Sequence, residues 1–151
     1  MRRAPLPYLL FLIAAYPAEA QVSVAGTRNL AFGLLTLGVT SDVTPTDPIK
    51  SGQWTLTAPT DQRIQVRLTV PNQLLGPSGA TLPLTIKNNY AFLQGTWSGA
   101  VAEFFNPPGN VNFKFTGGTS AILRLGGSIT PAANQRPGAY TNSAIVTITV
   151  F

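Results

Sequence analysis

Apolar and polar residues alternate with a period of two over several short stretches of the chain. The clearest stretch is residues 63–70 (RIQVRLTV), in which every even-numbered residue is apolar and every odd-numbered residue is polar. Successive side chains of a β-strand point to opposite faces of its sheet, so this stretch predicts a strand with one buried and one solvated face. Similar alternation predicts further strands at residues 53–57, 82–86, 111–115, 121–129 and 144–151.

Residues that favour turns separate these stretches. Examples are Pro71-Asn72, Gly76-Pro77 and Gly117-Gly118. Short strands separated by turn signals about every ten residues are typical of a β-sandwich or a β-barrel. Residues 21–151 contain no segment with helical periodicity and no linker that would divide them. We therefore expect one all-β domain, an antiparallel β-sandwich, over residues 21–151.

The first 20 residues have the pattern of a secretory signal peptide. Arg2 and Arg3 precede an apolar stretch at residues 8–16 (YLLFLIAAY), and Ala18 and Ala20 place small residues where a signal peptidase reads the chain. The apolar stretch is far shorter than the roughly 20 residues that a membrane-spanning helix needs. We expect cleavage after Ala20, export of the domain, and no stable membrane insertion.

The composition excludes most catalytic chemistry. The chain has no histidine and no cysteine, so it has no imidazole base, no thiol nucleophile, no disulfide and none of the common zinc sites. Four acidic residues follow residue 20, and none forms the carboxylate pair that glycoside hydrolysis requires. Two of them, Asp42 and Asp47, lie in a turn-rich segment, where we expect backbone capping in preference to calcium binding. We predict that the protein is not an enzyme and needs no cofactor and no metal.

The charge pattern does not indicate nucleic-acid binding. The chain carries ten lysine or arginine residues and five acidic residues, a formal net charge of +5. Beyond residue 20 the basic residues are dispersed singly and form no run, as expected for solvated strand faces. Among the aromatic residues, Trp54 shares its parity with Leu56 and is predicted to lie in the core. Phe104 and Phe105 are adjacent, so only one of them can point inward from a strand.

Three segments, in order along the chain, resemble the pilin-like domains of bacterial chaperone-usher systems, especially the spore coat protein U group and its cysteine-free relatives. Residues 29–33 (NLAFG) resemble the first-strand motif of those domains. Residues 51–70 are similar to their second and third strands with the turn between them. Residues 137–151 (PGAYTNSAIVTITVF) resemble a pilin C-terminal strand, with Gly138 fourteenth from the end, Tyr140 two residues later, and a terminal aromatic residue, Phe151.

This resemblance implies an immunoglobulin-like sandwich that lacks its last strand. Its hydrophobic groove would bind a periplasmic chaperone first and then a strand from the next subunit. The residues of this chain that would flank the acceptor groove are Val146, Ile148 and Val150. In the segment before NLAFG, Val22 and Val24 would supply a short donor strand.

We therefore expect an exported structural or adhesive subunit of a cell-surface or pilus-like assembly. It would be found in the periplasm, at the cell surface or outside the cell, with a chaperone, an usher and like subunits as partners. One alternative is a self-complete secreted or periplasmic sandwich that binds a glycan or a protein. Another is a small outer-membrane β-barrel, because such chains can also end in phenylalanine. Against the barrel, the residues counted back by twos from Phe151 are mostly polar.

Overall fold

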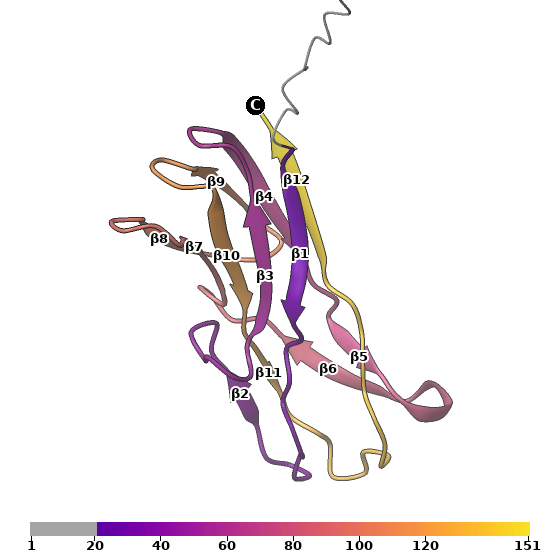
Figure 1. Ribbon diagram of the computed structural model, residues 1–151. Helices are drawn as coiled ribbons and strands as arrows, with labels where there is room; N and C mark the ends of the chain where they lie inside the picture. Colours follow the sequence, from indigo (N-terminus) through magenta and orange to yellow (C-terminus); the bar gives the residue numbers. More distant parts are fainter. Residues whose placement is uncertain (1–20) are drawn as a thin grey trace, which may run out of the picture.

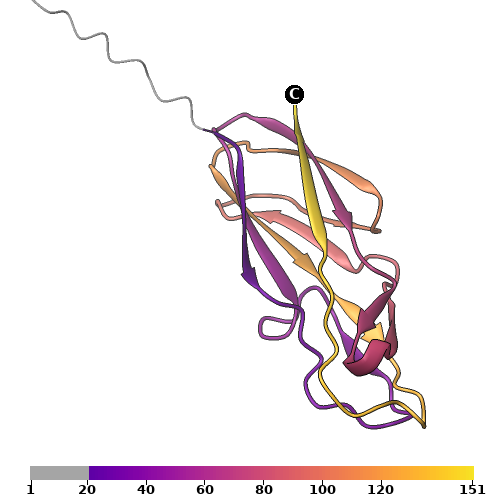
Figure 2. The ribbon, with the colours of Figure 1, turned by 90° about the vertical axis from the view of Figure 1, so that its right-hand side faces the viewer.

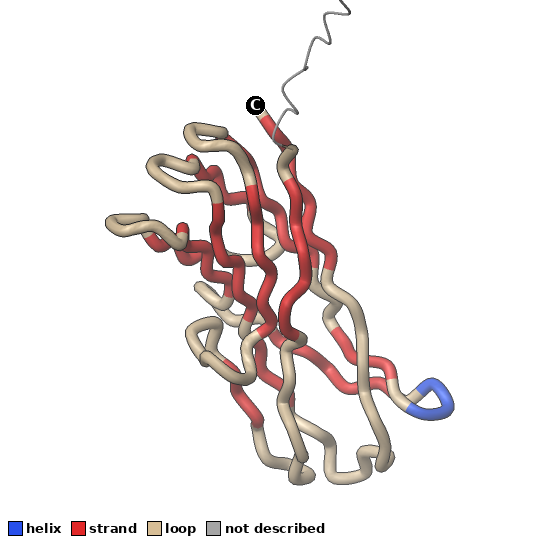
Figure 3. Tube along the Cα trace, viewed as in Figure 1, coloured by secondary structure: helices blue, strands red, loops and turns tan. Residues whose placement is uncertain are grey.

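The computed structural model describes residues 21–151, so the signal peptide predicted on residues 1–20 lies outside the described residues. Strands and loops make up nearly all of this part of the chain (Figure 3). In chain order the elements are β1 (Ser23–Arg28), β2 (Ser41–Val43), β3 (Gly52–Thr57), β4 (Arg63–Thr69), β5 (Gln73–Leu75), the 3₁₀ turn η1 (Pro77–Gly79), β6 (Thr81–Thr85), β7 (Ala91–Gly95), β8 (Ala102–Phe105), β9 (Asn110–Lys114), β10 (Ser120–Leu125), β11 (Gly127–Ile129) and β12 (Ile145–Val150).

The strands form three sheets, and every strand pair is antiparallel (Figure 1). The largest sheet has the order β1-β3-β10-β7-β8, and a second sheet has the order β12-β4-β9. A third sheet, β2-β11-β6-β5, forms the other end of the molecule. The predicted all-β, antiparallel architecture is confirmed.

The main core lies between the first sheet, β1-β3-β10-β7-β8, and the second sheet, β12-β4-β9. The even-numbered residues Ile64, Val66 and Leu68 of β4 are fully buried, as the alternation predicted. They pack in one cluster with residues of the opposite sheet, among them Leu56 of β3 and Leu123 of β10. A smaller hydrophobic cluster consists of Leu82, Leu84 and Ile129, which belong to β6 and β11 of the third sheet.

A glycine links two of the sheets. The chain leaves β10, passes Gly126 and continues as β11, so one long stretch of alternating sequence serves two sheets. A Cβ atom at Gly126 would lie 2.3 Å from the carbonyl oxygen of Val43. Only glycine lets the two backbones approach this closely.

Five strands were not predicted from the sequence: β1, β2, β5, β7 and β8. Strand β7 shows one reason, because its consecutive residues Ala91, Phe92 and Leu93 are all buried and leave no alternation. Phe92 lies on the outer face of the sheet, where the ring of Phe104 covers it at a centroid distance of 4.9 Å. Phe105 is buried and Phe104 exposed, so the prediction that only one of them points inward is confirmed.

Candidate functional site

The first sheet, β1-β3-β10-β7-β8, and the second sheet, β12-β4-β9, approach each other at one side of the molecule and separate at the other. On the first side, the edge strands β8 and β9 lie close together. On the second side the edges are β1 and β12, and in the described part of the chain no backbone hydrogen bond joins them. Figure 2 shows β12 and β1 apart from each other on this side. Two unpaired sheet edges therefore border the same opening.

The backbone of β12 directs three of its residues toward the opening. Phe151, the residue after the strand, donates its N–H to the carbonyl oxygen of Arg63 in β4 at 3.2 Å. Hydrogen-bonding groups of successive strand residues point to opposite sides, so residues 145, 147 and 149 face β4 in the same way. The N–H and C=O groups of Val146, Ile148 and Val150 therefore point away from β4, into the opening.

The same argument applies to β1. Ala58, just after β3, donates its N–H to Thr119 on the side of β10, so residues 55 and 57 face β1. These two residues pair with Ala25 and Ser23. The backbone groups of the intervening residue Val24, and of Gly26, consequently point into the opening from the other side.

The residues whose backbone points into the opening also bring apolar side chains to it. Val146, Ile148 and Val150 pair with the fully buried residues Leu68, Val66 and Ile64, which shows that they face the core. Even so, Val146 and Ile148 are only half-buried and Val150 is 51% exposed. On the other edge, Val24 is 41% exposed. The apolar side chains along the two edges are therefore partly exposed, whereas the core residues behind them are fully buried.

The edge formed by β12 also lacks the charged residues that the edge strands β2, β8 and β9 carry. An inward-pointing or exposed charge on an edge strand discourages pairing with another chain. Edge strand β8 carries Glu103, β9 carries Lys114 and β2 carries Asp42. The six residues of β12 include no charge, no proline and no glycine.

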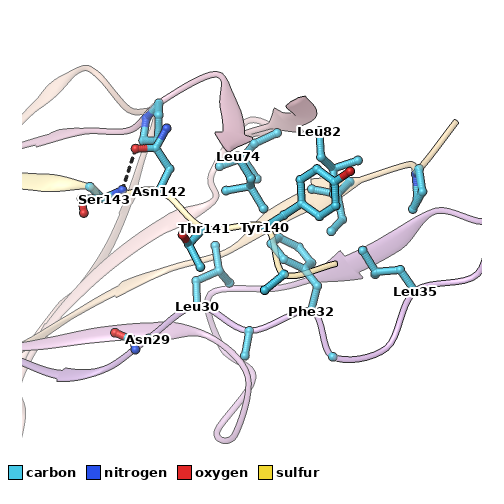
Figure 4. Close-up of a pocket in the computed structure, with 18 of the residues that line it drawn as sticks. Asn29, Leu30, Phe32, Leu35, Leu74, Leu82, Tyr140, Thr141, Asn142 and Ser143 are labelled. Carbon is cyan, nitrogen blue, oxygen red and sulfur yellow. Dashed lines mark hydrogen bonds between the residues drawn. The ribbon is translucent and has the colours of Figure 1, made fainter. Parts of the chain in front are cut away.

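The opening continues toward the third sheet as an apolar groove of about 1000 Å³. One wall is residues 29–37, and the other is residues 137–144. Figure 4 shows Leu30, Phe32 and Leu35 from the first wall near Tyr140 from the second. Leu74 and Leu82 also line the groove. Two arginines, Arg28 and Arg136, line it as well, and no carboxylate does.

The second wall is firmly attached to the hairpin of β5 and β6. Thr141 and Leu75 exchange two backbone hydrogen bonds, of 2.8 and 2.9 Å. The hydroxyl of Tyr140 donates to the carbonyl oxygen of Arg136 at 2.8 Å and accepts from the Gln135 side chain at 2.6 Å. The Tyr140 ring lies directly over Gly76, where a Cβ atom would come within 2.4 Å of it. These hydrogen bonds and this ring contact attach the wall to the rest of the domain.

The first wall has fewer attachments, and its position corrects a prediction. The NLAFG segment, predicted as the first strand, follows β1 as an extended segment without strand pairing. Its Ala31 N–H donates to Lys50 at 2.9 Å, and the Gly38 N–H donates to Pro131 at 2.8 Å. The side chain of Leu34, between these two bonds, is fully exposed. The first strand forms earlier because the residues just before NLAFG pair with β3.

Arg28 fixes the end of β1 where this wall begins. Its Nε donates to the carbonyl oxygen of Ser51 at 2.7 Å, and its Nη2 donates to the Ser51 hydroxyl at 2.9 Å. The same guanidinium also bonds the Pro48 carbonyl oxygen and the Gln53 side chain. These bonds hold the start of the wall against the loop that precedes β3.

The acidic residues lie away from the groove. Asp47 accepts the backbone N–H groups of Ile49 and Lys50 at 2.8 and 2.7 Å, which confirms its predicted role as a turn cap. Asp42 does not cap a turn, because it lies in β2 and binds Lys87 at 2.8 Å and the Tyr90 hydroxyl at 2.7 Å. Its hydrogen bond with Lys87 lowers the pKa of Asp42 and raises the pKa of Lys87. Within residues 21–151, no three acidic side chains gather as metal ligands would.

The structure places all eight residues that the sequence singled out around this opening or next to it. The residues at its two edges are Val22, Val24, Val146, Ile148 and Val150. Gly138 and Tyr140 belong to the second wall. Phe151 ends the chain beyond β12, beside Arg63, and is 61% exposed.

Val22 and Val24 have a different position from the one expected of a donor strand. Val24 lies in β1 and pairs with Leu56 of the same domain, and Val22 packs against the main core. Donation by this segment would require β1 to separate from β3. In this structure the two valines therefore belong to the edge of the opening.

Sequence reasoning missed the apolar residues of the groove. Leu30 and Phe32 alternate along the first wall, and this period-two signal was present in the sequence. Leu74 and Leu82 lie on two different strands, β5 and β6, and become neighbours only when these strands pair. The alternation within one strand therefore could not show that they line the same groove.

No protein-family model matches the chain, and a search of curated proteins found no match. Among residues 21–151, no helix is both long enough and apolar enough to cross a membrane.

Proposed function

We propose that this protein is an exported structural or adhesive subunit that binds a β-strand of a partner polypeptide in the opening between β1 and β12. The observation that carries the proposal is that, at both edges, the same residues provide apolar side chains and unpaired backbone groups. The residues that turn apolar side chains toward the core also direct unpaired N–H and C=O groups into the opening. Only an extended peptide with alternating apolar residues satisfies both requirements at once.

The charges around the groove restrict the partner further. Arg28 and Arg136 line the groove without any carboxylate, and neither β1 nor β12 carries an acidic residue. A strand with basic residues would meet like charge there. We therefore assign the site to an extended segment that is neutral or acidic.

The corner at Tyr140 supports an immunoglobulin-like arrangement. In immunoglobulin-like sandwiches, a tyrosine near the start of a late strand bonds a backbone carbonyl a few residues upstream. The Tyr140 hydroxyl bonds the carbonyl of Arg136 in this way, five residues before β12 begins. The resemblance of residues 137–151 to a pilin C-terminal strand agrees with this interpretation. On that basis the proposed partners are a periplasmic chaperone, an usher and like subunits, and the proposed location is the periplasm or the cell surface.

Peptide binding tests the proposal. The probe is a synthetic peptide of about ten residues that alternates valine with threonine and has glutamate at both ends. The wild-type protein should bind it and should unfold at a higher temperature in its presence. A matched peptide with lysine at both ends should bind more weakly.

Two substitutions in β12 form a matched pair. Ile148→Asp places a charge on the apolar side of the opening and should weaken peptide binding at least tenfold. Thr147→Asp places the same charge on the exposed face and should leave binding nearly unchanged. Val150→Asp, at the exposed end of the strand, replaces the first variant if that variant does not fold. A wild-type protein that binds neither peptide would show that the opening is not a strand acceptor.

A further inference from the structure

We infer that Gly26 forms a subsite for one large apolar side chain of the bound strand, above the indole ring of Trp54. This inference rests on the proposed function and names the chemistry of its ligand at one position. Gly26 lies directly opposite Trp54 in the β1–β3 pair. It has the same parity as Val22 and Val24, so it faces the core as they do.

The backbone does not require glycine at this position. A Cβ atom on Gly26 would meet only the Trp54 ring, at 3.6 and 3.7 Å, which is ordinary van der Waals contact. By contrast, a Cβ atom at Gly76 or Gly95 would come within 2.4 Å of an aromatic ring. The register shift after Gly26 is no explanation either, because the φ angle of Gly26 is not in the positive range that some bulges need.

A glycine inside a strand also costs stability, because it packs no side chain and is flexible in the unfolded chain. A side chain at this position would cover part of Trp54 and fill part of the opening. A larger residue than glycine would therefore fit at position 26, and the space beside Trp54 remains open because glycine has no side chain.

On the opposite edge of the opening, the residue nearest this end is also small. The groove-facing row of the C-terminal segment begins at Ala144 and continues with larger residues at Val146 and Ile148. Gly26 lies in the second half of β1, and Ala144 immediately precedes β12. In Figure 1, β1 ends and β12 begins at the lower end of the two strands. Gly26 and Ala144 both line the groove, whereas Val24 and Val146 do not. The groove thus reaches the opening at the two smallest residues that face it from its edges.

The surroundings define the chemistry of the subsite. Trp54, Leu30 and Leu125 line the same groove as Gly26. An indole ring and two leucine side chains suit an aromatic or a large aliphatic side chain. The neighbouring apolar residue of the bound strand, two positions away, would face Val24 and has less room. We therefore assign to the ligand a strand with one bulky residue at the level of Gly26 and smaller residues beyond it.

The experiment compares a series of alternating valine–threonine peptides in which one valine at a time is replaced by phenylalanine or by alanine. The wild-type protein should favour phenylalanine over alanine at one position by about tenfold, the gain expected from burying the larger side chain. Gly26→Val should remove this preference while the alanine peptide still binds. The control is Ala25→Val, which adds bulk to the same strand on its exposed face and should keep the preference.

The outcomes separate the subsite from the proposed function. If the peptides bind but no position favours phenylalanine, or if Gly26→Val keeps the preference, the subsite is wrong and strand binding remains. If no peptide binds to the wild-type protein, both are wrong. The fluorescence of Trp54, measured in a Trp97→Phe background, should change on binding of the phenylalanine peptide in the wild-type protein and in Ala25→Val.

Discussion

Val146 lies directly opposite Leu68 in the β12–β4 pair, and yet Leu68 is fully buried whereas Val146 is only half-buried. Both side chains face the same core. The difference arises because β4 has a neighbour on each side, β12 and β9, whereas β12 has a neighbour only at β4. The exposed area of Val146 thus marks the place where one more strand would complete the sheet.

This relationship predicts how two truncations should differ. Leu68→Ala should destabilise the isolated protein by about 2 to 5 kcal/mol, as large-to-small changes in a packed core do. Val146→Ala should cost less than about 1.5 kcal/mol, because much of the side chain is already in contact with water. Denaturant unfolding measures both values. With the peptide bound, the cost of Val146→Ala should increase. A cost that is the same with and without peptide would show that Val146 does not contact the ligand.

The position of the second groove wall should depend on the contact between Tyr140 and Gly76. Gly76→Ala would force the Tyr140 ring to move, at a cost of about 1 to 3 kcal/mol for overpacking. Gly95→Ala is the matched control, since it would displace the ring of Trp97 in the same manner on the far side of the domain. Only Gly76→Ala should accelerate hydrogen exchange at the amides of Leu75 and Thr141. Equal exchange in the two variants would contradict the attachment of this wall through Tyr140.

Glu103 should protect the edge formed by β8. Its side chain lies on the same side of the sheet as its partner Leu93 and so points inward at an edge strand. Glu103→Val should therefore increase aggregation of the protein, measured by light scattering at rising concentration. Glu103→Gln retains a polar group and should aggregate less than the valine variant. Scattering equal to wild type for Glu103→Val would show that the charge has no such role.

Stability should decrease in acid partly through Asp42. Its pKa is lower in the folded protein, chiefly because of the hydrogen bond from Lys87. The stabilisation is therefore complete above the ordinary Asp pKa of 3.8 and is lost as the pH falls through the lowered pKa of the folded state. Because both side chains are more than one-third exposed, the effect should be small and should weaken in salt. Thermal unfolding of Asp42→Asn should show a shallower loss of stability below pH 4 than wild type. Identical acid profiles would contradict this contribution.

The strands that could be predicted from the sequence are mainly those with one face toward the core and the other toward water. In β4, β9 and β12 one face contacts the core and the other contacts water, so the period of two is visible. In β7 it is hidden, because Phe104 covers Phe92 on the outer face. The β12 edge of the opening could be predicted, because Val146, Ile148 and Val150 alternate within one continuous segment. The β1 edge was not predicted, because Val22 and Val24 were expected in a donor strand and instead pair or pack within the domain. The rest of the groove could not be predicted, because long-range pairings such as Leu75 with Thr141 bring its parts together.

Hydrogen exchange at the individual amides of β12 is the most direct test of an open acceptor edge. In the isolated protein, the amides of residues 145, 147 and 149 should exchange slowly, because they bond β4, and those of Val146, Ile148 and Val150 should exchange fast. Addition of the alternating peptide with glutamate ends should slow the second set and leave the first set little changed. Slow exchange at Val146, Ile148 and Val150 in the isolated protein, or no change when the peptide is bound, would contradict the account.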